Sequence, residues 1–459
     1  MHTAELNWQN QGGLRSERQT FPARGENTGC IERKRVVLIE DVFSTDNLNA
    51  AYKKVVSNKG APGIDGITVN ELRDYWLAHA DQIQREITRG TYTPNPVRKV
   101  EIPKPGGGIR VLGVPCVVDR LILQSLHQVL SPIFEEGFSD FSFGFRPKRS
   151  AHDALKLAVE HIAVGNTWVV NVDLEKFFDR VNHDILMSRI ARKIEDKLVL
   201  KLIRRYLQAG IMDNGVIQPR REGTVQGAPL SPLLSNIMLD DLDKELEERG
   251  HRFCRFADDF NVYVKSKRAG ERVMESIERF LWNKLKLPIN KEKSLVVRSS
   301  QHVYLGYGFY GYKNPRLKIA PKSYERLKNK IRESLPRWRG MKLQTVIKEI
   351  NRMVQGWIVY FRLADGKAKI EKLESWILRH LRCIVWRQWK TSRTRFNKLR
   401  SYGVNRSKAA RAAWGRSGPW YSSATSAMNF ALPRVYFQSL GWLGLSNLYN
   451  KFKLDVKFV

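Results

Sequence analysis

The chain has 459 residues, 42% of them hydrophobic, which excludes a disordered protein and allows two or three domains with substantial cores. Its 79 Lys and Arg against 46 Asp and Glu give a formal charge of +33, so nucleic acid is the first expected partner. No run of about 18 apolar residues occurs and the four Cys lack paired spacing, which argues against a membrane span, a zinc ribbon and a disulfide framework. We expect a soluble, cytoplasmic protein without a membrane partner.

The positive charge is concentrated in the last third of the chain. Residues 321–459 hold 30 Lys and Arg against 7 Asp and Glu, whereas residues 1–320 hold 49 against 39. Eight of the 12 Trp also lie after residue 320, so nucleic-acid bases could stack on aromatic rings among these charges. A Trp-rich helical core with a solvated basic exterior explains the same composition.

The first elements in chain order are an arm, a helix, a hairpin and a second helix. Residues 1–40 are polar and aperiodic, which predicts a loosely ordered arm that tightens on a partner. A helix is predicted over residues 44–60. Residues 97–115 predict two strands around a Gly-rich turn that could approach a phosphate or could simply be flexible. A longer helix follows over residues 117–134.

Two acidic signals come at the ends of predicted strands. The run Trp168–Val172 predicts a buried strand that ends at Asp173, although an Asp there could also cap a following helix. The stretch "RFCRFADDFNVYVKS" predicts a β-hairpin with Asp258 and Asp259 at its tip, although Asp is common in turns for backbone reasons alone.

The three carboxylates would converge if the two strands are neighbours in one sheet. They would then repel one another strongly unless a cation lies among them. Oxygen-only ligands favour Mg²⁺, with Mn²⁺ as a substitute. Two such ions about 3.5–4 Å apart can activate an attacking hydroxyl and stabilise a leaving pyrophosphate.

Further helices are predicted between the two acidic signals and in the last third of the chain. The loop at Gln226 and Gly227 leads into a helix that opens with "PLSP", where Pro suits the first turn. After residue 320, apolar residues that recur every three or four positions predict three amphipathic helices. Their apolar positions are Leu327, Ile331 and Leu335, then Val346, Ile350, Met353, Val354, Trp357 and Phe361, then Leu373, Trp376, Ile377, His380, Leu381 and Ile384. Beyond Lys390 the pattern weakens into a basic stretch.

These motifs, in this order, resemble the reverse transcriptases encoded by group II introns, also called maturases. "FADD" stands where the family usually has a Tyr-Ala-Asp-Asp box, and "VNVDLEKFFD" resembles its first metal-binding motif. "SFGFRPKRSAHDA" and "QGAPLSPLLSN" resemble the intervening motifs, "NKLKLPINKEKS" and "VYLGYGF" the motifs after the hairpin, and "VQGWIVYFRLAD" the maturase-specific helices. The series covers roughly residues 45–445, and its order is far more specific than any single box.

The resemblance implies an α+β fold, a right-hand polymerase of bacterial type. Fingers and palm, with an antiparallel palm sheet, would occupy residues 41–315, after the arm of residues 1–40. A helical thumb and maturase domain would follow at residues 316–390, and a basic region that binds RNA or DNA at residues 391–459.

The resemblance also implies metal ligands, carried over position by position. Asp173, Asp258 and Asp259 would be the catalytic residues that hold two Mg²⁺ ions, with the backbone carbonyl of Leu174 as a further ligand. One departure from the family pattern is Phe256, which replaces the usual Tyr and removes a hydroxyl near the nucleic acid.

Substrate contacts follow in the same way. Lys104 and Arg110 would bind the triphosphate of the incoming nucleotide, or would be only solvated hairpin charges. Phe178 would exclude a ribose 2′-hydroxyl, or would belong to the core. Gln226 would contact the nucleotide sugar and the template base. Lys293 would assist pyrophosphate departure as a general acid, or would be a surface lysine on a strand.

The implied function is an RNA-directed DNA polymerase that also binds intron RNA and assists splicing and retrohoming. Its partners would be group II intron RNA, an RNA template with a DNA primer, target DNA and deoxynucleoside triphosphates. Because no His follows His380 and no Cys follows Cys383, we expect no DNA-endonuclease domain of the His- and Cys-rich kind. Two other hypotheses stay open: a splicing factor with a vestigial polymerase, and a host-adopted relative in DNA repair or phage defence.

Overall fold

The computed structural model describes residues 38–103, 107–213 and 215–454. The described chain forms two compact units, one within Met1–His161 and Asn166–Val297, the other within Ile162–Gly165 and Arg298–Val459. All but the last three residues of the expected N-terminal arm lie outside the described residues.

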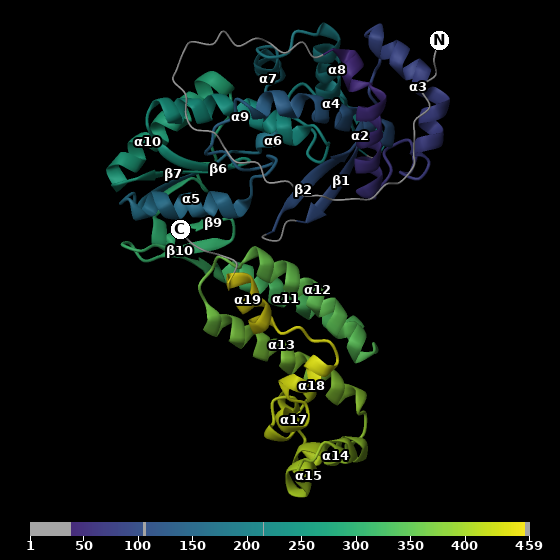
Figure 1. Cartoon of the computed structure of the whole chain (residues 1–459), viewed down its shortest axis with the longest axis vertical. Helices are drawn as coiled ribbons and strands as arrows, with labels where there is room; N and C mark the ends of the chain where they lie inside the picture. The colour runs from purple at the N-terminus through teal and green to yellow at the C-terminus, as the bar shows by residue number, and fades with distance from the viewer. Residues whose placement is uncertain (1–37, 104–106, 214, 455–459) are drawn as a thin grey trace. The chain divides into compact units, whose positions relative to one another are not determined.

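The central sheet of the first unit has the strand order β6-β7-β3-β8. Its strands are β3 (Trp168–Asp173), β6 (Arg252–Phe256), β7 (Asp259–Val264) and β8 (Leu295–Arg298). The β-branched run of β3 is buried in the middle of this sheet, and α10 packs against β3 and β7. The antiparallel pairing of β3 with β7 confirms that the two acidic strands are neighbours. Figure 1 shows β7 beside β6 and close to α10.

A second sheet carries the Gly-rich hairpin, in the order β2-β1-β4-β5. Strands β1 (Val97–Pro103) and β2 (Ile109–Val114) are antiparallel, which confirms the predicted hairpin. Strand β4 (Ile211–Asp213) pairs in parallel with β1 and forms a second hairpin with β5 (Val216–Gln218).

Helices pack against the central sheet and supply most of the core of the first unit. Helix α4 is buried along much of its length and packs against α2, and both were predicted from periodicity. The helices with residues in the first unit are α1 (Ile39–Val42), α2 (Thr45–Ser57), α3 (Leu72–Thr88), α4 (Val117–Glu135), α5 (Ala151–Ala163), α6 (Phe177–Arg180), α7 (His183–Ile190), α8 (Lys197–Gln208), α9 (Ser231–Glu248) and α10 (Lys267–Phe280), which continues as a π-helical turn (Leu281–Leu285).

The second unit joins a small antiparallel sheet to a set of helices. The sheet has the order β11-β10-β9, with β9 (Val303–Tyr304), β10 (Tyr307–Tyr310) and β11 (Arg316–Ile319). Helices α11 (Pro321–Trp338), α12 (Leu343–Tyr360) and α13 (Lys367–Gln388) confirm the three predicted amphipathic helices. Up to residue 454, where the described part of the chain ends, six shorter helices follow: α14 (Ser392–Ser401), α15 (Arg406–Trp414), α16 (Pro419–Ser422), α17 (Ser426–Ala431), α18 (Arg434–Ser439) and α19 (Leu445–Leu454).

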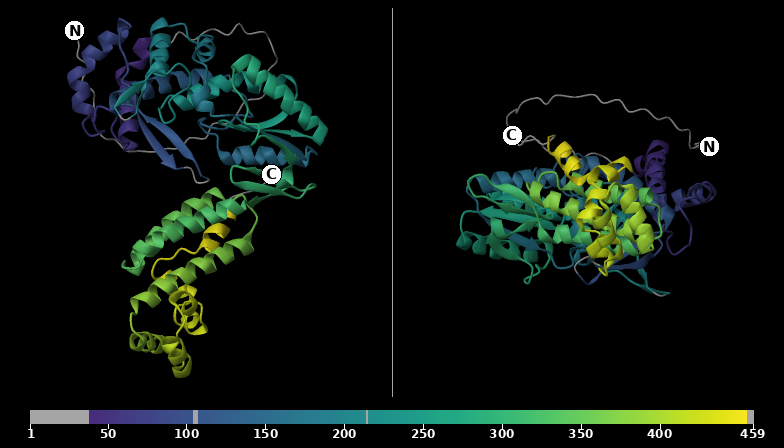
Figure 2. Two further views of the ribbon diagram at one scale, coloured as in Figure 1. Left: turned by 180° about the vertical axis from the view of Figure 1, so that it is seen from behind. Right: turned by 90° about the horizontal axis from the view of Figure 1, so that it is seen from below.

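The last helix stabilises the arrangement of the long ones. Helix α19 packs against both α12 and α13, and the left view of Figure 2 shows it as a yellow helix between green ones. The buried Glu374 on α13 accepts a hydrogen bond from the backbone N–H of Ser446 at 3.0 Å and another from the Trp442 indole at 3.2 Å. Among the described residues, no helix is both long enough and apolar enough to cross a membrane.

Candidate active site

Three carboxylates meet at one end of the central sheet. Asp173 is the last residue of β3 and lies directly opposite Asp259, the first residue of β7, so the two side chains share a face of the sheet. Asp258 and Ala257 form the two-residue turn between β6 and β7. Asp173 does not cap a helix, because α6 begins later, after Lys176. The capping alternative is therefore wrong.

The carboxylates are close enough to perturb one another. The pKa of Asp259 is raised to about 7, first by burial and then by the charges of Asp258 and Asp173. The pKa of Asp258 is also raised, mainly by burial, and the charge of Asp173 contributes. Since burial and like charge both oppose ionisation, a cation placed among these oxygens would relieve the repulsion.

The segment between the π-helical turn (Leu281–Leu285) and β8 holds the end of β3 in place. Leu174 forms an antiparallel bridge with Ile289, and the Asn290 N–H donates to the Asp173 carbonyl at 2.7 Å. The Asp173 N–H donates to the Ser294 hydroxyl at 3.1 Å. These contacts fix the backbone on both sides of the Asp173 side chain.

Lys293 is placed beside this carboxylate. Its Nζ lies 3.7 Å from Asp173 Oδ2, and the two side chains are 68% and 42% exposed. The residue lies in a turn before β8 and not on a strand, so that part of the surface-lysine alternative is wrong. The structure brings an exposed cationic side chain to the acidic site.

Of the two basic residues predicted to bind the triphosphate from the Gly-rich hairpin, Arg110 is described. Arg110 on β2 lies opposite Ile102 on β1, and its charge lowers the pKa of Asp258 against the larger effect of burial. Arg110 is therefore within electrostatic reach of the acidic turn. Lys104 lies outside the described residues.

Phe178 and the Gln226 loop lie side by side. Phe177 is buried in the core, whereas Phe178 is half-buried. The Thr224 N–H donates to the Phe178 carbonyl at 2.6 Å, and the Gln226 carbonyl accepts from the Gly113 N–H at 3.0 Å. In the described part of the chain, no hydrogen bond joins Phe178 or Gln226 to the three carboxylates.

The donor set is compatible with a divalent ion. Within residues 38–103, 107–213 and 215–454, no three His, Cys, Asp or Glu side chains are gathered tightly enough to hold a metal by themselves. Mg²⁺ does not need such a cage, because it usually keeps several waters and takes one or two carboxylates together with substrate phosphates. The oxygen-only donors and their mutual repulsion fit an ion whose shell the substrate completes.

Sequence reasoning missed a charged group behind the acidic turn. Arg255 on β6 and Asp243 on α9 are both fully buried and form an ion pair. The only local signal is a basic residue within the apolar strand "RFCRF". Its acidic partner could not be recognised, because Asp243 belongs to a helix rich in acidic residues.

Comparison with known proteins supports the resemblance to group II intron reverse transcriptases. A family model described as reverse transcriptase (RNA-dependent DNA polymerase) matches residues 102–309, and one described as the group II intron maturase-specific domain matches residues 324–403. Protein YkfC of Escherichia coli (strain K12) is 33% identical over 316 residues, covering 60% of this chain and 82% of YkfC.

Two further relatives are encoded by introns according to their names. The group II intron-encoded protein LtrA of Lactococcus lactis subsp. cremoris is 31% identical, and the match covers 61% of this chain and 57% of LtrA. The putative COX1/OXI3 intron 2 protein of Saccharomyces cerevisiae is also 31% identical, with 61% of this chain and 31% of that protein covered.

The antiparallel palm sheet followed by a helical region is the α+β reverse transcriptase fold. Reverse transcriptases of this family use divalent metal ions and bind nucleic acid. The chain therefore belongs to the family of group II intron-encoded reverse transcriptases, also called maturases.

Proposed function

We propose that this chain extends a DNA primer on an RNA template with deoxynucleoside triphosphates, and that it also binds a group II intron RNA and assists its splicing and retrohoming into target DNA. The observation that carries the polymerase half is the meeting of Asp173, Asp258 and Asp259 at one end of the central sheet. The maturase half is supported by the match over residues 324–403.

Asp173, Asp258 and Asp259 would hold two Mg²⁺ ions, with the Leu174 carbonyl as a further ligand. When bound, the ions would supply activation of the primer hydroxyl and stabilisation of charge on the pyrophosphate. The protein's own part is to present the oxygens at fixed positions. The pairing of β3 with β7 and the contacts of Asn290 with the end of β3 support this role.

Basic and aromatic groups around the acids would bind the nucleotide. Arg110 would clamp the triphosphate with its planar fork, together with Lys104. Lys293 would protonate the departing pyrophosphate, and its place 3.7 Å from Asp173 supports this. Phe178 would exclude a 2′-hydroxyl, and Gln226 would contact the sugar and the template base.

The division of labour along the chain is also proposed. Residues 41–315 would form fingers and palm, residues 316–390 the thumb and maturase domain, and residues 391–459 a basic region that binds RNA or DNA. The charge of +23 carried by residues 321–459 supports tight, salt-dependent binding to a phosphate backbone. Recognition of one intron would come from the shape of the folded RNA.

Two assays on one preparation test both halves. Wild type and Asp258→Ala/Asp259→Ala are compared for extension of a labelled DNA primer on RNA with Mg²⁺, and for binding and splicing of the intron RNA. We expect the double variant to lose extension and to keep RNA binding and splicing. A folded wild type that splices without extending would favour the splicing factor, and one that extends without recognising intron RNA would favour the host-adopted polymerase.

A further inference from the structure

A fully buried arginine lies directly behind the acidic turn. Arg255 Nε lies 2.8 Å and 3.0 Å from the two carboxylate oxygens of Asp243, and Nη2 lies 2.5 Å from one of them. Both side chains have no exposed surface. A buried ion pair of this kind is weak evidence for stability, since desolvation offsets most of the attraction. Its other contacts therefore decide what it does.

The third nitrogen of the guanidinium reaches the acidic turn itself. Arg255 Nη1 donates to the carbonyl of Ala257 at 3.0 Å and to Oδ1 of Asn236 at 2.9 Å. Ala257 has a φ of +60°, in the left-handed region that residues with a Cβ rarely adopt. Because the Ala257 carbonyl belongs to the peptide that leads into Asp258, this bond fixes the plane from which that carboxylate projects.

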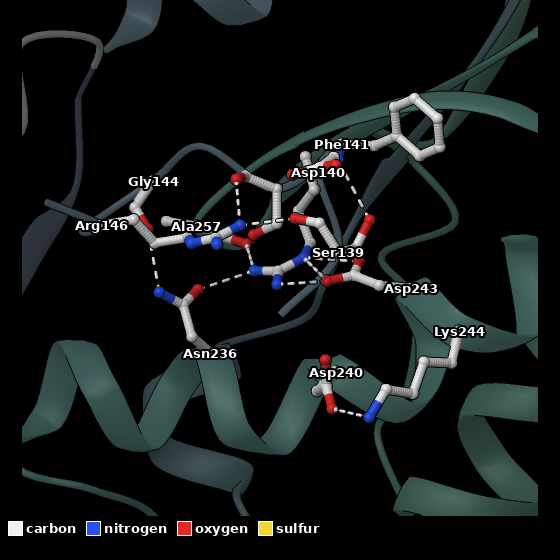
Figure 3. Close-up of polar contacts among 12 residues, drawn as sticks. Ser139, Asp140, Phe141, Gly144, Arg146, Asn236, Asp240, Asp243, Lys244 and Ala257 are labelled. Atoms are coloured by element: carbon white, nitrogen blue, oxygen red, sulfur yellow. Dashed lines mark hydrogen bonds and ion pairs between the residues drawn. The ribbon is translucent and has the colours of Figure 1, made fainter. Parts of the chain in front are cut away.

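A second segment closes on the turn from the other side. Asn236 Nδ2 donates to the Gly144 carbonyl at 2.9 Å, so one amide links that segment to the guanidinium. The Arg255 N–H donates to the Phe141 carbonyl and the Phe143 N–H to the Arg255 carbonyl, both at 2.9 Å. Figure 3 shows the Asn236 side chain pointing from its helix toward the Gly144 segment and Ala257, whereas Asp243 lies nearer Ser139 and Phe141.

Only a planar fork can make all of these contacts at once. The guanidinium spans Asp243 on one edge and the Ala257 carbonyl on the other, which a lysine ammonium cannot do from one position. A lysine could still balance the charge of Asp243. The contacts thus separate two roles, charge compensation and orientation of the turn.

We propose that Arg255 is a positioning residue for the reaction, which holds the Ala257–Asp258 peptide so that the Asp258 carboxylate points where divalent ions bind. This inference rests on the proposed function. Asn236 and Asp243 act through Arg255 and touch neither substrate nor ion. The ion pair with Asp243 holds the Arg255 guanidinium in place, and the guanidinium in turn orients the Ala257–Asp258 peptide.

The test uses Arg255→Lys, which keeps the charge and removes the fork. Asn236→Ala is the second variant, because it leaves the Arg255–Asp243 pair in place and removes the bond that aims Nη1. The matched control is Asp241→Asn on the same helix, which removes ion pairs with Arg189 and Arg192 that do not reach the turn. All are full-length chains whose folding is checked by thermal unfolding.

Two readouts are measured on each variant. Mn²⁺ affinity is titrated by electron paramagnetic resonance with a chain-terminated primer, RNA template and nucleotide bound, and kcat and KM for nucleotide come from primer extension. We expect Arg255→Lys to bind Mn²⁺ at least about tenfold more weakly and to lose about 10²-fold in kcat at unchanged nucleotide KM. Asn236→Ala should change both in the same direction, and the control should match wild type.

The outcomes separate this inference from the proposed function. Folded Arg255→Lys and Asn236→Ala proteins with wild-type Mn²⁺ affinity would overturn the positioning role. If Arg255→Lys does not fold, Asn236→Ala decides alone by the same two readouts. A wild type that extends no primer would refute polymerisation, and the Mn²⁺ affinities would still decide whether Arg255 orients the turn.

Discussion

Gly144 packs directly against the backbone of the acidic turn, so Gly144→Ala tests how precisely that turn must be placed. A Cβ built at Gly144 would lie 2.2 Å from the Ala257 nitrogen and 2.8 Å from the Phe256 carbonyl carbon. Ordinary contact begins near 3.4 Å, so the turn or the Gly144 segment must move by about 1.2 Å. Both partners are backbone, and neither can give way by a rotamer change.

A displacement of that size at the Asp258 turn should be costly for chemistry. A misplacement of about 1 Å can lower a rate by about 10²-fold, and overpacking costs about 1–3 kcal/mol of stability. Single-turnover primer extension should therefore slow about 10²-fold in Gly144→Ala, with a loss of about 1–3 kcal/mol in urea unfolding.

The control for this substitution is Gly356→Ala. Gly356 lies inside α12 with open space around its Cβ position, so the change should stabilise the protein by about 0.5–1 kcal/mol and leave the rate unchanged. Wild-type kinetics in Gly144→Ala would show that the turn tolerates the shift, and the reasoning from backbone contact would fail.

Three further predictions follow from the same structure. Burial raises the pKa of Asp119 from 3.8 to about 6, so the fold loses about 3 kcal/mol of unfolding free energy as pH rises from about 4 to above 6. Asp119→Asn should lack that loss in denaturant titrations, and equal pH profiles for the two proteins would contradict it. Lys293→Ala should slow single-nucleotide incorporation about 10²-fold, whereas Lys291→Ala, which removes only the exposed pair with Glu278, should not; equal rates would remove Lys293 from the chemistry. Phe178→Ala should raise ribonucleotide incorporation relative to deoxynucleotides about 10²-fold, measured as the ratio of kcat/KM values, and an unchanged ratio would assign Phe178 to the core alone.

The local sequence pattern was enough to predict an element where that element is long or where its residues are chemically unusual. Helices α11 to α13 repeat apolar residues over many turns, and β3 is a β-branched run, so both could be predicted. Asp173 and the Asp258–Asp259 pair stood out because carboxylates follow strands directly. The pairing of β3 with β7 then confirmed that they meet.

The rest of the fold and of the site depends on tertiary contacts, which the amino-acid sequence alone does not reveal. Strands β4 and β5 have three residues each, too few for a period, and the parallel pairing of β4 with β1 joins residues more than a hundred positions apart. Lys293 lies in a turn because β8 begins only at Leu295. Arg255 could be recognised as important only once its burial and its bond to the Ala257 carbonyl were known.

The most direct test of the central claim is the extension of a labelled DNA primer on an RNA template by wild type and Asp173→Asn, with Asp241→Asn as control. The substitution keeps the shape of Asp173 and removes its charge from the site shared with Asp258 and Asp259. We predict that wild type and control extend the primer and that Asp173→Asn slows by about 10³-fold or more while still binding the duplex. Extension by Asp173→Asn at the wild-type rate would contradict the assignment of the three carboxylates as one catalytic site.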